Sequence, residues 1–310
     1  MRKSVEVLKE SIKGEVLLNE PLFKHCSFKI GGPAEVLVKP YDVYDLQTAL
    51  SWAKRNKMPV FVMGNGTNVI FSDSGVAGVV IKLSEGFSYL EFSGTEALVQ
   101  AGFPIQGLLE EAMKRGLGGM EFAWGIPGAV GGSIVMNAGS NSHFVSTRVN
   151  YIDVMDLNGK VFQMKHDELK FDYRYSILQD EELILFDALF NFERRPPEEI
   201  GRERDLNLRM RRQKQPISYP CAGSVFKNPP TTYAGRVIEE TGCKGLKVGD
   251  AQISELHANF IVNLGNATAF DVVSLIRKVQ NRVYKQKDLI LDLEVKLVGN
   301  FEGIELLKKK

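Results

Sequence analysis

Residues 60–68 read VFVMGNGTN, an apolar run followed by a loop that contains Gly64 and Gly66. Four apolar residues that end at a glycine predict a short buried strand. Glycines directly after such a strand let backbone N–H groups approach phosphate oxygens closely. Gly-Asn-Gly is also a common turn, and the loop lacks the G-x-G-x-x-G spacing of a Rossmann fold. The segment alone therefore leaves a pyrophosphate site and an ordinary turn as open alternatives.

The segments around this loop alternate between strand and helix patterns. Residues 45–56 predict a helix because their apolar side chains recur on one face, and GVVIKL (78–83) predicts a further strand. Residues 105–115 show the helical pattern again before more glycines. This part of the chain therefore favours an α/β organisation.

Strand signals dominate the middle of the chain, and a long helix is expected near its end. Asn158-Gly159 lies between two apolar stretches and predicts a β-hairpin. Residues 268–286 predict a helix with Thr268 as its N-cap. Residues 289–298 alternate in polarity and predict a closing strand, which places Glu294 on a polar face or lining a cleft.

The segment from Arg194 to Gln215 changes in composition. It holds a pair of prolines, eight basic residues and few apolar positions. Four acidic residues in the same segment offset much of the positive field, which disfavours nucleic-acid binding. We expect a solvated helix that connects two domains.

The overall composition is that of an ordinary globular protein. The chain has 310 residues and a formal net charge of +1, which provides no global field for DNA or an anionic membrane. Its three scattered cysteines suit a reducing compartment better than a disulfide framework. Residues 1–13 lack the apolar core of a signal peptide, and no apolar run reaches the roughly 18 residues of a membrane span. We therefore expect a cytosolic protein that binds neither nucleic acid nor membrane.

A second cluster of glycines lies at residues 125–133, GIPGAVGGS. Four glycines within eight residues would let an extended ligand lie against bare backbone, with Pro127 fixing the entry. A tightly packed helix start beneath a sheet is the other interpretation. The ligand site and the packed helix start are compatible interpretations.

Two polar segments carry candidate catalytic side chains. In FDYRYS (171–176), Arg174 can bind a carboxylate through two hydrogen bonds, although an arginine packed on aromatic rings at the surface is the simpler interpretation. In PCAGSVFKNP (220–229), Ser224 lies among polar donors, although a turn hydroxyl is its ordinary role. The segment is not the G-x-S-x-G motif of hydrolases, so acyl chemistry ranks low.

The histidines point to no metal site. The four in the chain show no H-x-x-x-H spacing, and the cysteines no C-x-x-C spacing, so we expect neither zinc nor iron. His257, just before an apolar stretch, is more often a structural residue than a catalyst, and a role beside the substrate stays open.

Eight segments, taken in order, resemble the UDP-N-acetylenolpyruvoylglucosamine reductase family over about residues 20–300. These segments are SFKIGG (27–32), GNGTNV (64–69), GIPGAVGG (125–132), FDYRYS (171–176), AGSVFKNP (222–229), AGRVIEETGCKGLKVGDAQIS (234–254), HANFIVN (257–263) and LEVKLVG (293–299). A single one could arise by chance, whereas the ordered set could not.

The resemblance implies an α+β fold of the vanillyl-alcohol-oxidase (PCMH) type. Two α+β subdomains would enclose FAD, and a C-terminal α+β domain would bind the substrate. The implied parts are an N-terminal helical segment at 1–20, FAD-binding subdomains at 21–90 and 91–195, a connecting helix at 196–215 and a substrate-binding domain at 216–302.

The resemblance also implies FAD as cofactor and NADPH as reductant. The positions that match the family's FAD contacts are Gly31, Gly32, Gly64, Asn65, Gly66, Thr67, Asn68, Val69, Ile126, Pro127, Gly128, Gly131, Gly132 and Ser133.

Members of the family reduce the enolpyruvyl ether of a UDP-sugar to a lactyl ether, which gives UDP-N-acetylmuramate for peptidoglycan precursors. Hydride passes from the reduced flavin to one alkene carbon, and an enzyme acid protonates the other. Arg174 matches the arginine that stabilises charge developing on the substrate carboxylate. Glu294 matches a glutamate that polarises the same carboxylate, for which its pKa would have to be raised. Ser224 matches the proton donor.

Tyr173, Lys227 and Asn228 match positions near the substrate, where cationic and amide donors suit a diphosphate. Only 49 residues separate Arg174 from Ser224. The chain thus resembles the shorter branch of the family, without the tyrosine-bearing insertion that closes over the substrate. The resemblance implies that the chain binds the UDP-sugar and NADPH, and we expect a monomer.

Two other functions stay open on the sequence alone. A related FAD-dependent hydroxy-acid or alcohol oxidase would share the fold and the glycine clusters but not the motifs of Ser224 and Glu294. A flavin-free protein that binds nucleotide sugars for regulation would keep the fold and be colourless.

Overall fold

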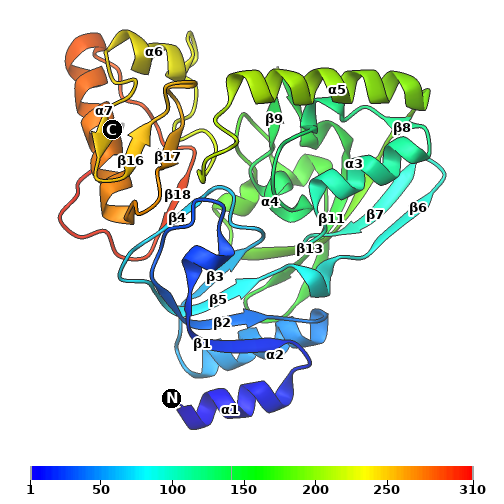
Figure 1. Ribbon diagram of the computed structural model, residues 1–310. Helices are drawn as coiled ribbons and strands as arrows, with labels where there is room; N and C mark the ends of the chain where they lie inside the picture. The colour runs from blue at the N-terminus through cyan, green and yellow to red at the C-terminus, as the bar shows by residue number, and fades with distance from the viewer. Residues whose placement is uncertain (1, 141, 309–310) are drawn as a thin grey trace. The chain divides into compact units, whose positions relative to one another are not determined.

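The computed structural model describes residues 2–140 and 142–308 (Figure 1). The described residues group into two compact units. Unit 1 holds the chain up to Leu18 together with Val36–Asn65 and Gly78–Met210, and unit 2 holds Asn19–Glu35, Gly66–Ala77 and the chain from Arg211 onward. The chain therefore enters unit 2 three times. The five-part division expected from the sequence stays a prediction.

The first sheet combines four strands of the described chain with helices α1 (Arg2–Ser11) and α2 (Val43–Arg55). Its strands, in spatial order, are β1 (Glu15–Pro21), β2 (Pro33–Lys39), β5 (Val76–Lys82) and β3 (Val60–Met63). Strands β3 and β5 pair in parallel. Helix α2 forms where it was predicted, and the Asp42 carboxylate caps it by accepting the N–H of Asp45.

The second sheet of unit 1 is antiparallel throughout, with five strands in the residues described. Their order is β12 (Val161–Lys165), β11 (Val149–Asp156), β13 (Leu183–Asn191), β7 (Glu96–Gln100) and β6 (Leu90–Ser93). Strands β11 and β12 form the predicted hairpin. Gly159 has a φ of +85° there, and Asp156 Oδ1 accepts the N–H groups of Asn158 and Lys160.

Two helices pack near this sheet. Helix α3 (Ile105–Lys114) forms as predicted, and α4 (Val130–Val135) packs against β13 and β7. Two pairs of two-residue strands join loops of the same unit, β8 (Leu117–Gly118) with β14 (Glu193–Arg194) and β9 (Gly139–Ser140) with β10 (His143–Phe144).

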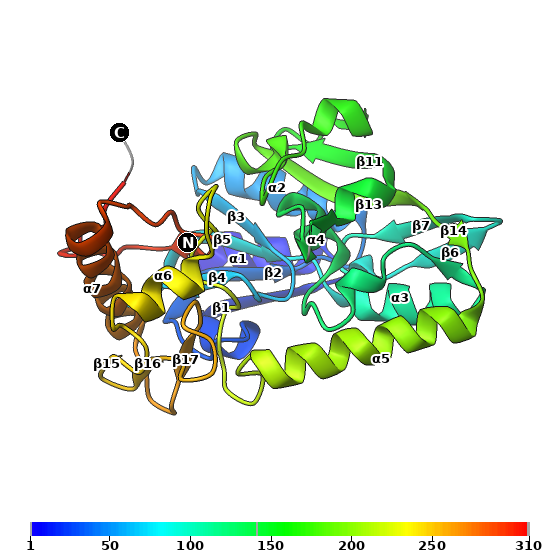
Figure 2. The same cartoon turned by 90° about the horizontal axis from the view of Figure 1, so that it is seen from above.

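The predicted connecting helix is α5 (Pro197–Lys214), which runs alongside α3 in both ribbon views (Figures 1 and 2). Among the described residues of α5, Ile200 alone is buried. The partly buried Leu208 also packs against the hydrophobic core, so few apolar side chains hold this helix and polar contacts add to them.

Unit 2 combines short strands with helices α6 (Ala234–Glu240) and α7 (Ala269–Lys287). The strands β15 (Lys247–Val248), β16 (Ala251–Ile253) and β17 (Ile261–Asn263) form an antiparallel sheet, and β4 (Val69–Phe71) pairs in parallel with β18 (Lys296–Val298). Thr268 is the N-cap of helix α7 as predicted, and Thr268 and Asp271 form a capping box.

The closing strand predicted over residues 289–298 is wrong in its extent. Regular pairing is confined to β18, and Asp288 ends α7 with a φ of +50°. The residues between α7 and β18 make isolated contacts instead of a regular strand pairing. The N–H of Glu294 donates to the Val225 carbonyl at 2.8 Å, and Leu293 forms an isolated bridge with Phe226. The polarity pattern reflected a two-sided environment, but in the part of the chain that the structure describes only the last three residues of this segment pair with a neighbouring strand, β4.

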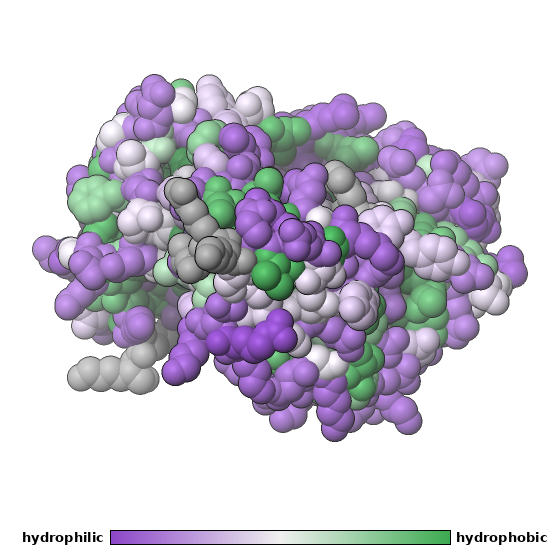
Figure 3. Space-filling view, turned by 90° about the horizontal axis from the view of Figure 1, so that it is seen from below, coloured by the Kyte–Doolittle hydropathy of each residue, from purple (hydrophilic) through white to green (hydrophobic). Residues whose placement is uncertain are grey.

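The described helices include none that is long and apolar enough to cross a membrane. The face shown in Figure 3 is mostly hydrophilic, and its hydrophobic side chains lie in small separate groups. Scattered apolar side chains are usual on protein surfaces and indicate no particular partner.

Asp187 lies in β13, the middle strand of the antiparallel sheet, opposite Asp153 on β11 and Gln100 on β7. Burial, and then the charge of Asp153, raise the pKa of Asp187 to about 6. The folded chain thus binds this proton more tightly than the unfolded chain does. Ionisation therefore costs stability, and the loss develops from the ordinary pKa of 3.8 up to about 6 and is complete above it.

Asp187→Asn should therefore raise the melting temperature at pH 7.5 and change it much less at pH 4. The full pKa difference would correspond to about 3 kcal/mol. Because the side chain is partly exposed, solvent screening should reduce the gain to about 1 kcal/mol, or about 2–4 °C. Thermal unfolding at the two pH values measures the difference.

Asp156→Asn, on β11, is the control with the opposite sign. Hydrogen bonds from the backbone N–H groups of Lys160 and Asn158 lower the pKa of Asp156. This variant should lose stability at pH 7.5, and the loss should shrink at pH 3. An equal gain from Asp187→Asn at pH 4 and pH 7.5 would contradict the role given to its charge.

Candidate active site

The glycine loop Gly125–Ser133 leads into α4 in unit 1. Gly128 has a φ of +125°, which side chains rarely allow. Backbone hydrogen bonds fix the loop against residues 101–105, and one of them joins the Gly131 N–H to the Ala101 carbonyl at 2.8 Å. The tightly packed helix start considered from the sequence is thus present.

Gly131 and Gly132 differ in what surrounds them. A Cβ on Gly131 would lie 2.8 Å from the Cβ of Ala101, so packing alone requires glycine there. A Cβ on Gly132 would meet no heavy atom of the described chain within 4 Å, and the residue is exposed. Alanine would also favour the helix more than glycine does. The packing of the protein therefore does not explain Gly132, whereas a ligand lying against bare backbone does.

Gln106, in α3, fixes the start of this loop. Its Oε1 accepts the N–H of Gly125 at 2.9 Å, and its Nε2 donates to the carbonyls of Ala123 and Ile126 at 3.1 and 2.8 Å. The sequence analysis missed this residue. Its partners are backbone groups 17 to 20 positions away, so no local pattern identifies it.

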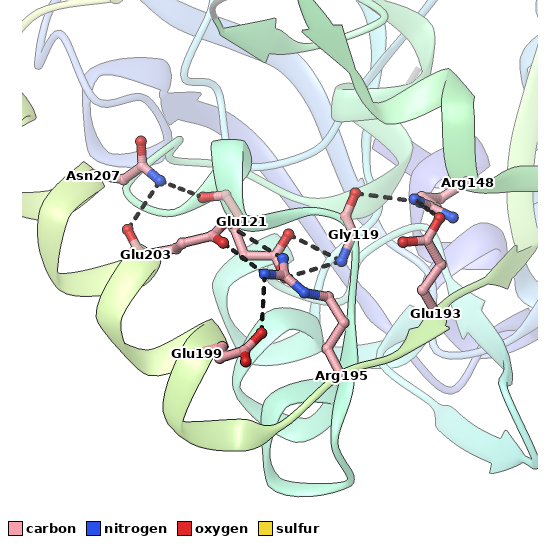
Figure 4. A network of polar contacts seen from close by, with 8 residues as sticks. All are labelled: Gly119, Glu121, Arg148, Glu193, Arg195, Glu199, Glu203 and Asn207. Atoms are coloured by element: carbon pink, nitrogen blue, oxygen red, sulfur yellow. Dashed lines mark hydrogen bonds and ion pairs between the residues drawn. The ribbon is translucent and has the colours of Figure 1, made fainter.

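A polar network joins α5 to the turn η3 (Glu121–Ala123), which ends one residue before Trp124 leads into the loop (Figure 4). The buried carboxylate of Glu121 accepts the N–H of Gly119 and pairs with Arg195 at 2.8 Å. Arg195 also pairs with Glu203 at 2.6 Å, and Asn207 donates to the carbonyls of Glu121 and Glu203. The turn from which the glycine loop departs is therefore attached to α5.

The two glycine clusters meet in unit 1. Gly64 and Asn65 follow β3, and a Cβ on Gly64 would lie 3.2 Å from the Cβ of Ala129. The structure thus brings together Gly64 and the loop that holds Ile126, Pro127 and Gly128. Ser133 is buried, and its hydroxyl donates to the Ala129 carbonyl at 3.0 Å.

Arg174 lies in a tight turn in which Asp172 and Tyr175 exchange two backbone hydrogen bonds of 3.1 Å. Its φ of +55° is in the left-handed region, which non-glycine residues rarely occupy. Its Nη2 donates to the Gly139 carbonyl at 2.9 Å, and its guanidinium lies 5.3 Å from the centre of the Tyr173 ring. The aromatic packing expected from the sequence is present, within an unusual turn.

This turn is fixed to the end of α4. The Ser176 hydroxyl donates to the Val135 carbonyl at 2.8 Å, and Asn137 Nδ2 donates to the Asp172 carbonyl at 2.9 Å. The glycine loop enters the same helix at its other end. A helix of 6 residues spans about 9 Å, so α4 sets the separation of Arg174 from the glycine loop.

In unit 2, close packing explains three of the predicted FAD contacts. A Cβ on Gly31 would lie 2.6 Å from the Cβ of Phe71, and one on Gly32 would lie 2.2 Å from the Asp73 carbonyl oxygen. A Cβ on Gly66 would lie 2.5 Å from the carbonyl oxygen of His25. These positions require glycine whether or not they touch FAD, and their contact with FAD stays a prediction.

The GNGTN loop ends beside Glu294. Asn68 Nδ2 donates to the Glu294 carbonyl, and the Asn68 carbonyl accepts the N–H of Lys296, both at 3.0 Å. Thr67 is partly buried, and Val69 is the buried first residue of β4. Two motifs far apart in the sequence are thus adjacent in unit 2.

Ser224 and Glu294 lie on neighbouring stretches of backbone. The Val225 carbonyl accepts the N–H of Glu294 at 2.8 Å, and the Val225 N–H donates to the Asn259 carbonyl at 2.8 Å. Ser224 is partly buried and forms an isolated bridge with Phe260. The structure therefore brings together two of the three predicted catalytic residues in unit 2, and Arg174 belongs to unit 1.

The predicted substrate contacts also divide between the units. Tyr173 belongs to unit 1, and Lys227 and Asn228 belong to unit 2. The N–H of Lys227 donates to the Asp292 carbonyl at 2.8 Å. Asn228 Oδ1 accepts the N–H of Ala234 at 3.0 Å and so helps to fix the first residue of α6.

His257 has the structural surroundings expected of it. Its ring lies 4.9 Å from the ring of Phe260, and burial lowers its pKa. The part of the chain that the structure describes has no group of three or more His, Cys, Asp or Glu residues that could hold a metal ion.

Comparison with known proteins identifies both parts of the chain. Residues 34–165 match the FAD binding domain family, and residues 215–298 match the UDP-N-acetylenolpyruvoylglucosamine reductase C-terminal domain family. UDP-N-acetylenolpyruvoylglucosamine reductase from Caldanaerobacter subterraneus is 43% identical to this chain, over 95% of this chain and 98% of its own length. The one from Alkaliphilus oremlandii is 44% identical over 92% of this chain and 93% of its own.

A solved structure agrees. The crystal structure of UDP-N-acetylenolpyruvylglucosamine reductase from Thermus caldophilus has a TM-score of 0.80 at 36% identity, covering 93% of this chain and 100% of that one.

An FAD-binding domain with glycine-rich loops defines the class: the protein is an oxidoreductase whose cofactor is FAD. The chain belongs to the UDP-N-acetylenolpyruvoylglucosamine reductase family. The predicted α+β fold of the vanillyl-alcohol-oxidase (PCMH) type is confirmed. The individual FAD contacts stay predictions, and Gly132 fits such a contact best.

Gly132→Ala should weaken FAD binding at least about 10-fold, because the added methyl group fills the space beside the bare backbone. The FAD-free protein should be at least as stable as the unmodified chain, since the methyl group meets nothing in the protein itself and alanine favours the helix. Titration of FAD by fluorescence and thermal unfolding of the FAD-free protein measure the two effects.

Gly131→Ala is the matched comparison. Its methyl group would press on Ala101, so this variant should lose stability even without FAD. Unchanged FAD affinity in Gly132→Ala would remove Gly132 from the cofactor site.

Proposed function

We propose that this protein uses NADPH to reduce UDP-N-acetyl-3-O-(1-carboxyvinyl)-glucosamine to UDP-N-acetylmuramate, a step of peptidoglycan precursor synthesis. The observation that carries the proposal is the hydrogen bond of 2.8 Å from the Glu294 N–H to the Val225 carbonyl, which holds Ser224 and Glu294 on neighbouring backbones. The names of relatives that match over nearly their full length support the same reaction. An oxidase of hydroxy acids or alcohols would not need this pair.

Bound FAD supplies the hydride-transfer chemistry. The double bond of the enolpyruvyl ether takes a hydride at one carbon and a proton at the other. The protein must therefore offer a proton donor and stabilise the negative charge that develops on the substrate carboxylate. These two tasks fall to different residues.

Ser224 is the proposed proton donor. A serine hydroxyl is a weak acid, so it acts only when it is held close to the accepting carbon. Space for a ligand lies beside it. Gly223 has a φ of +77°, and a Cβ there would meet no heavy atom of the described chain within 4 Å. The backbone next to Ser224 is therefore open to a substrate.

Arg174 and Glu294 are proposed to act on the substrate carboxylate. The guanidinium of Arg174 is a cation with several N–H donors, which suits the developing negative charge. Its hydrogen bond to Gly139 and its contact with the Tyr173 ring hold it in a fixed direction. Glu294 would polarise the same carboxylate as a protonated acid or through water. Lys227, Asn228 and Tyr173 are proposed to bind the UDP-sugar.

We retain the cytoplasmic location and the monomeric state as parts of the proposal. The described cysteines Cys26, Cys221 and Cys243 are free thiols, which suits a reducing compartment. Light scattering of the purified protein tests the monomeric state.

The visible spectrum of the purified protein tests the proposed reaction directly. We expect bands of oxidised flavin that bleach with NADPH in the absence of oxygen and return when the enolpyruvyl UDP-sugar is added. Bleaching without return would indicate a different acceptor, as in a related oxidase. A colourless protein that still bound the UDP-sugar after addition of FAD would overturn the enzymatic role.

Ser224→Ala should separate the two half-reactions. Flavin reduction by NADPH should stay within about 2-fold, whereas flavin oxidation by the enolpyruvyl substrate should slow at least about 100-fold because the proton donor is lost. Stopped-flow absorbance of the flavin measures both rates. Ser74→Ala, at an exposed serine of the same unit, is the control. Equal loss in both half-reactions would contradict the role of Ser224.

A further inference from the structure

The motif HANFIVN (257–263) has no task in the function proposed above, yet it contacts the segment that carries Ser224. We propose that Asn259 of this motif is a positioning residue: its side chain holds Ser224–Phe226 in the conformation that proton donation needs. This inference rests on the proposed role of Ser224.

Asn259 makes three hydrogen bonds to the two residues that follow Ser224. Its Oδ1 accepts the N–H of Phe226 at 3.0 Å, and its Nδ2 donates to the Phe226 carbonyl at 2.8 Å. Its main-chain carbonyl accepts the N–H of Val225 at 2.8 Å. Phe226 is 1% exposed and Asn259 4%, so water does not replace these bonds readily.

The local backbone explains why an amide side chain is needed. Residues 257–260 form a turn, in which the Phe260 N–H donates to the His257 carbonyl at 2.9 Å. A turn cannot offer Phe226 the continuous ladder of a regular strand. The carboxamide of asparagine carries the same donor and acceptor as a peptide group and takes its place. Aspartate would lack the donor, and leucine would lack both groups.

Asn259 is itself held in a fixed orientation. Its N–H donates to Nδ1 of His257 at 3.2 Å. Burial lowers the pKa of His257, which keeps the imidazole neutral and its Nδ1 able to accept. The edge contact between the rings of His257 and Phe260 completes the arrangement.

The other side of the same segment contacts Glu294. The Val225 carbonyl accepts the Glu294 N–H at 2.8 Å, and the Glu294 carbonyl accepts Nδ2 of Asn68 at 3.0 Å. The Ser224–Phe226 segment thus lies between Asn259 and Glu294. A shift of this segment moves Ser224 relative to Glu294, so loss of the Asn259 side chain should affect proton donation more than flavin reduction by NADPH.

The chain offers a matched control in the same unit. Gln280 Oε1 accepts the N–H of Leu307 at 3.0 Å, and its Nε2 donates to the carbonyls of Leu307 and Leu291 at 3.1 and 2.9 Å. It is 1% exposed. Gln280 therefore makes the same pair of bonds to one residue's backbone as Asn259 does, at a different place.

The experiment compares FAD-loaded Asn259→Asp with Gln280→Glu. In Asn259→Asp, flavin oxidation by the enolpyruvyl substrate should slow about 10- to 100-fold, as expected when a catalytic group is misplaced by about 1 Å, and flavin reduction by NADPH should stay within about 2-fold. Aspartate loses the donor to the Phe226 carbonyl, which should loosen the Ser224–Phe226 segment, so hydrogen–deuterium exchange at the amides of Val225 and Phe226 should become faster even though their acceptors remain. Gln280→Glu should lower the melting temperature comparably and leave both rates and these amides unchanged.

Three results would overturn the inference: parallel slowing of both half-reactions in Asn259→Asp, the same selective slowing in Gln280→Glu, or unchanged oxidation in Asn259→Asp. If Asn259→Asp does not fold, Asn259→Ser keeps one polar group and should show the same selective loss to a smaller degree. Ser224→Ala separates this inference from the proposed function. Fast oxidation in Ser224→Ala would refute the donor, whereas slow oxidation there with fast oxidation in Asn259→Asp would refute the positioning role alone.

Discussion

Unit 2 depends on the close approach of backbone to backbone on two sides of β4. On one side the Gly32 N–H donates to the Ser72 carbonyl at 2.8 Å, and on the other the Ser72 N–H donates to the Val298 carbonyl at 2.9 Å. A Cβ on Gly32 or on Gly299 would lie within 2.6 Å of a backbone oxygen, so neither position admits a side chain. Three segments from distant parts of the chain are thereby joined. The fold itself therefore requires these glycines, whether or not they also contact a ligand.

The parts of the fold that were predicted correctly have local signals. Helix α2 has its cap at Asp42, α7 has its capping box at Thr268, and the hairpin has Asn158-Gly159 at its turn. The extent of the closing strand was not predictable, because it depends on whether a distant segment runs beside it. The same limit applies to the site. Gly131 and Gly132 are alike in the sequence, and only the presence of Ala101 beside one of them shows that their tasks differ.

Buried or partly buried amide side chains recur where regular backbone pairing stops. Gln106 bonds to the start of the glycine loop, Asn259 to Phe226, and Gln280 to Leu307. Asn263 joins the end of β17 to the Phe28 carbonyl in the SFKIGG segment. Each supplies a donor and an acceptor in a place where irregular loops leave peptide groups without a neighbour. The residues of the site therefore rest on loops that are fixed by side chains, which explains how such short strands can hold a defined geometry.

The attachment of α5 has a consequence for how the chain responds to salt. In the described chain, Ile200 is the buried residue of this helix. The ion pairs that Arg195 forms with Glu199 and Glu203 of the helix lie at the surface, where both glutamates are half-exposed. Dissolved ions screen exposed pairs, so high ionic strength should loosen α5 before unit 1 unfolds. The helix ends in an arginine-rich stretch that contains Arg211 and Arg212, at the boundary after Met210. In concentrated salt, trypsin should therefore cut the chain first at Arg211 or Arg212, where it passes from unit 1 to unit 2 for the last time.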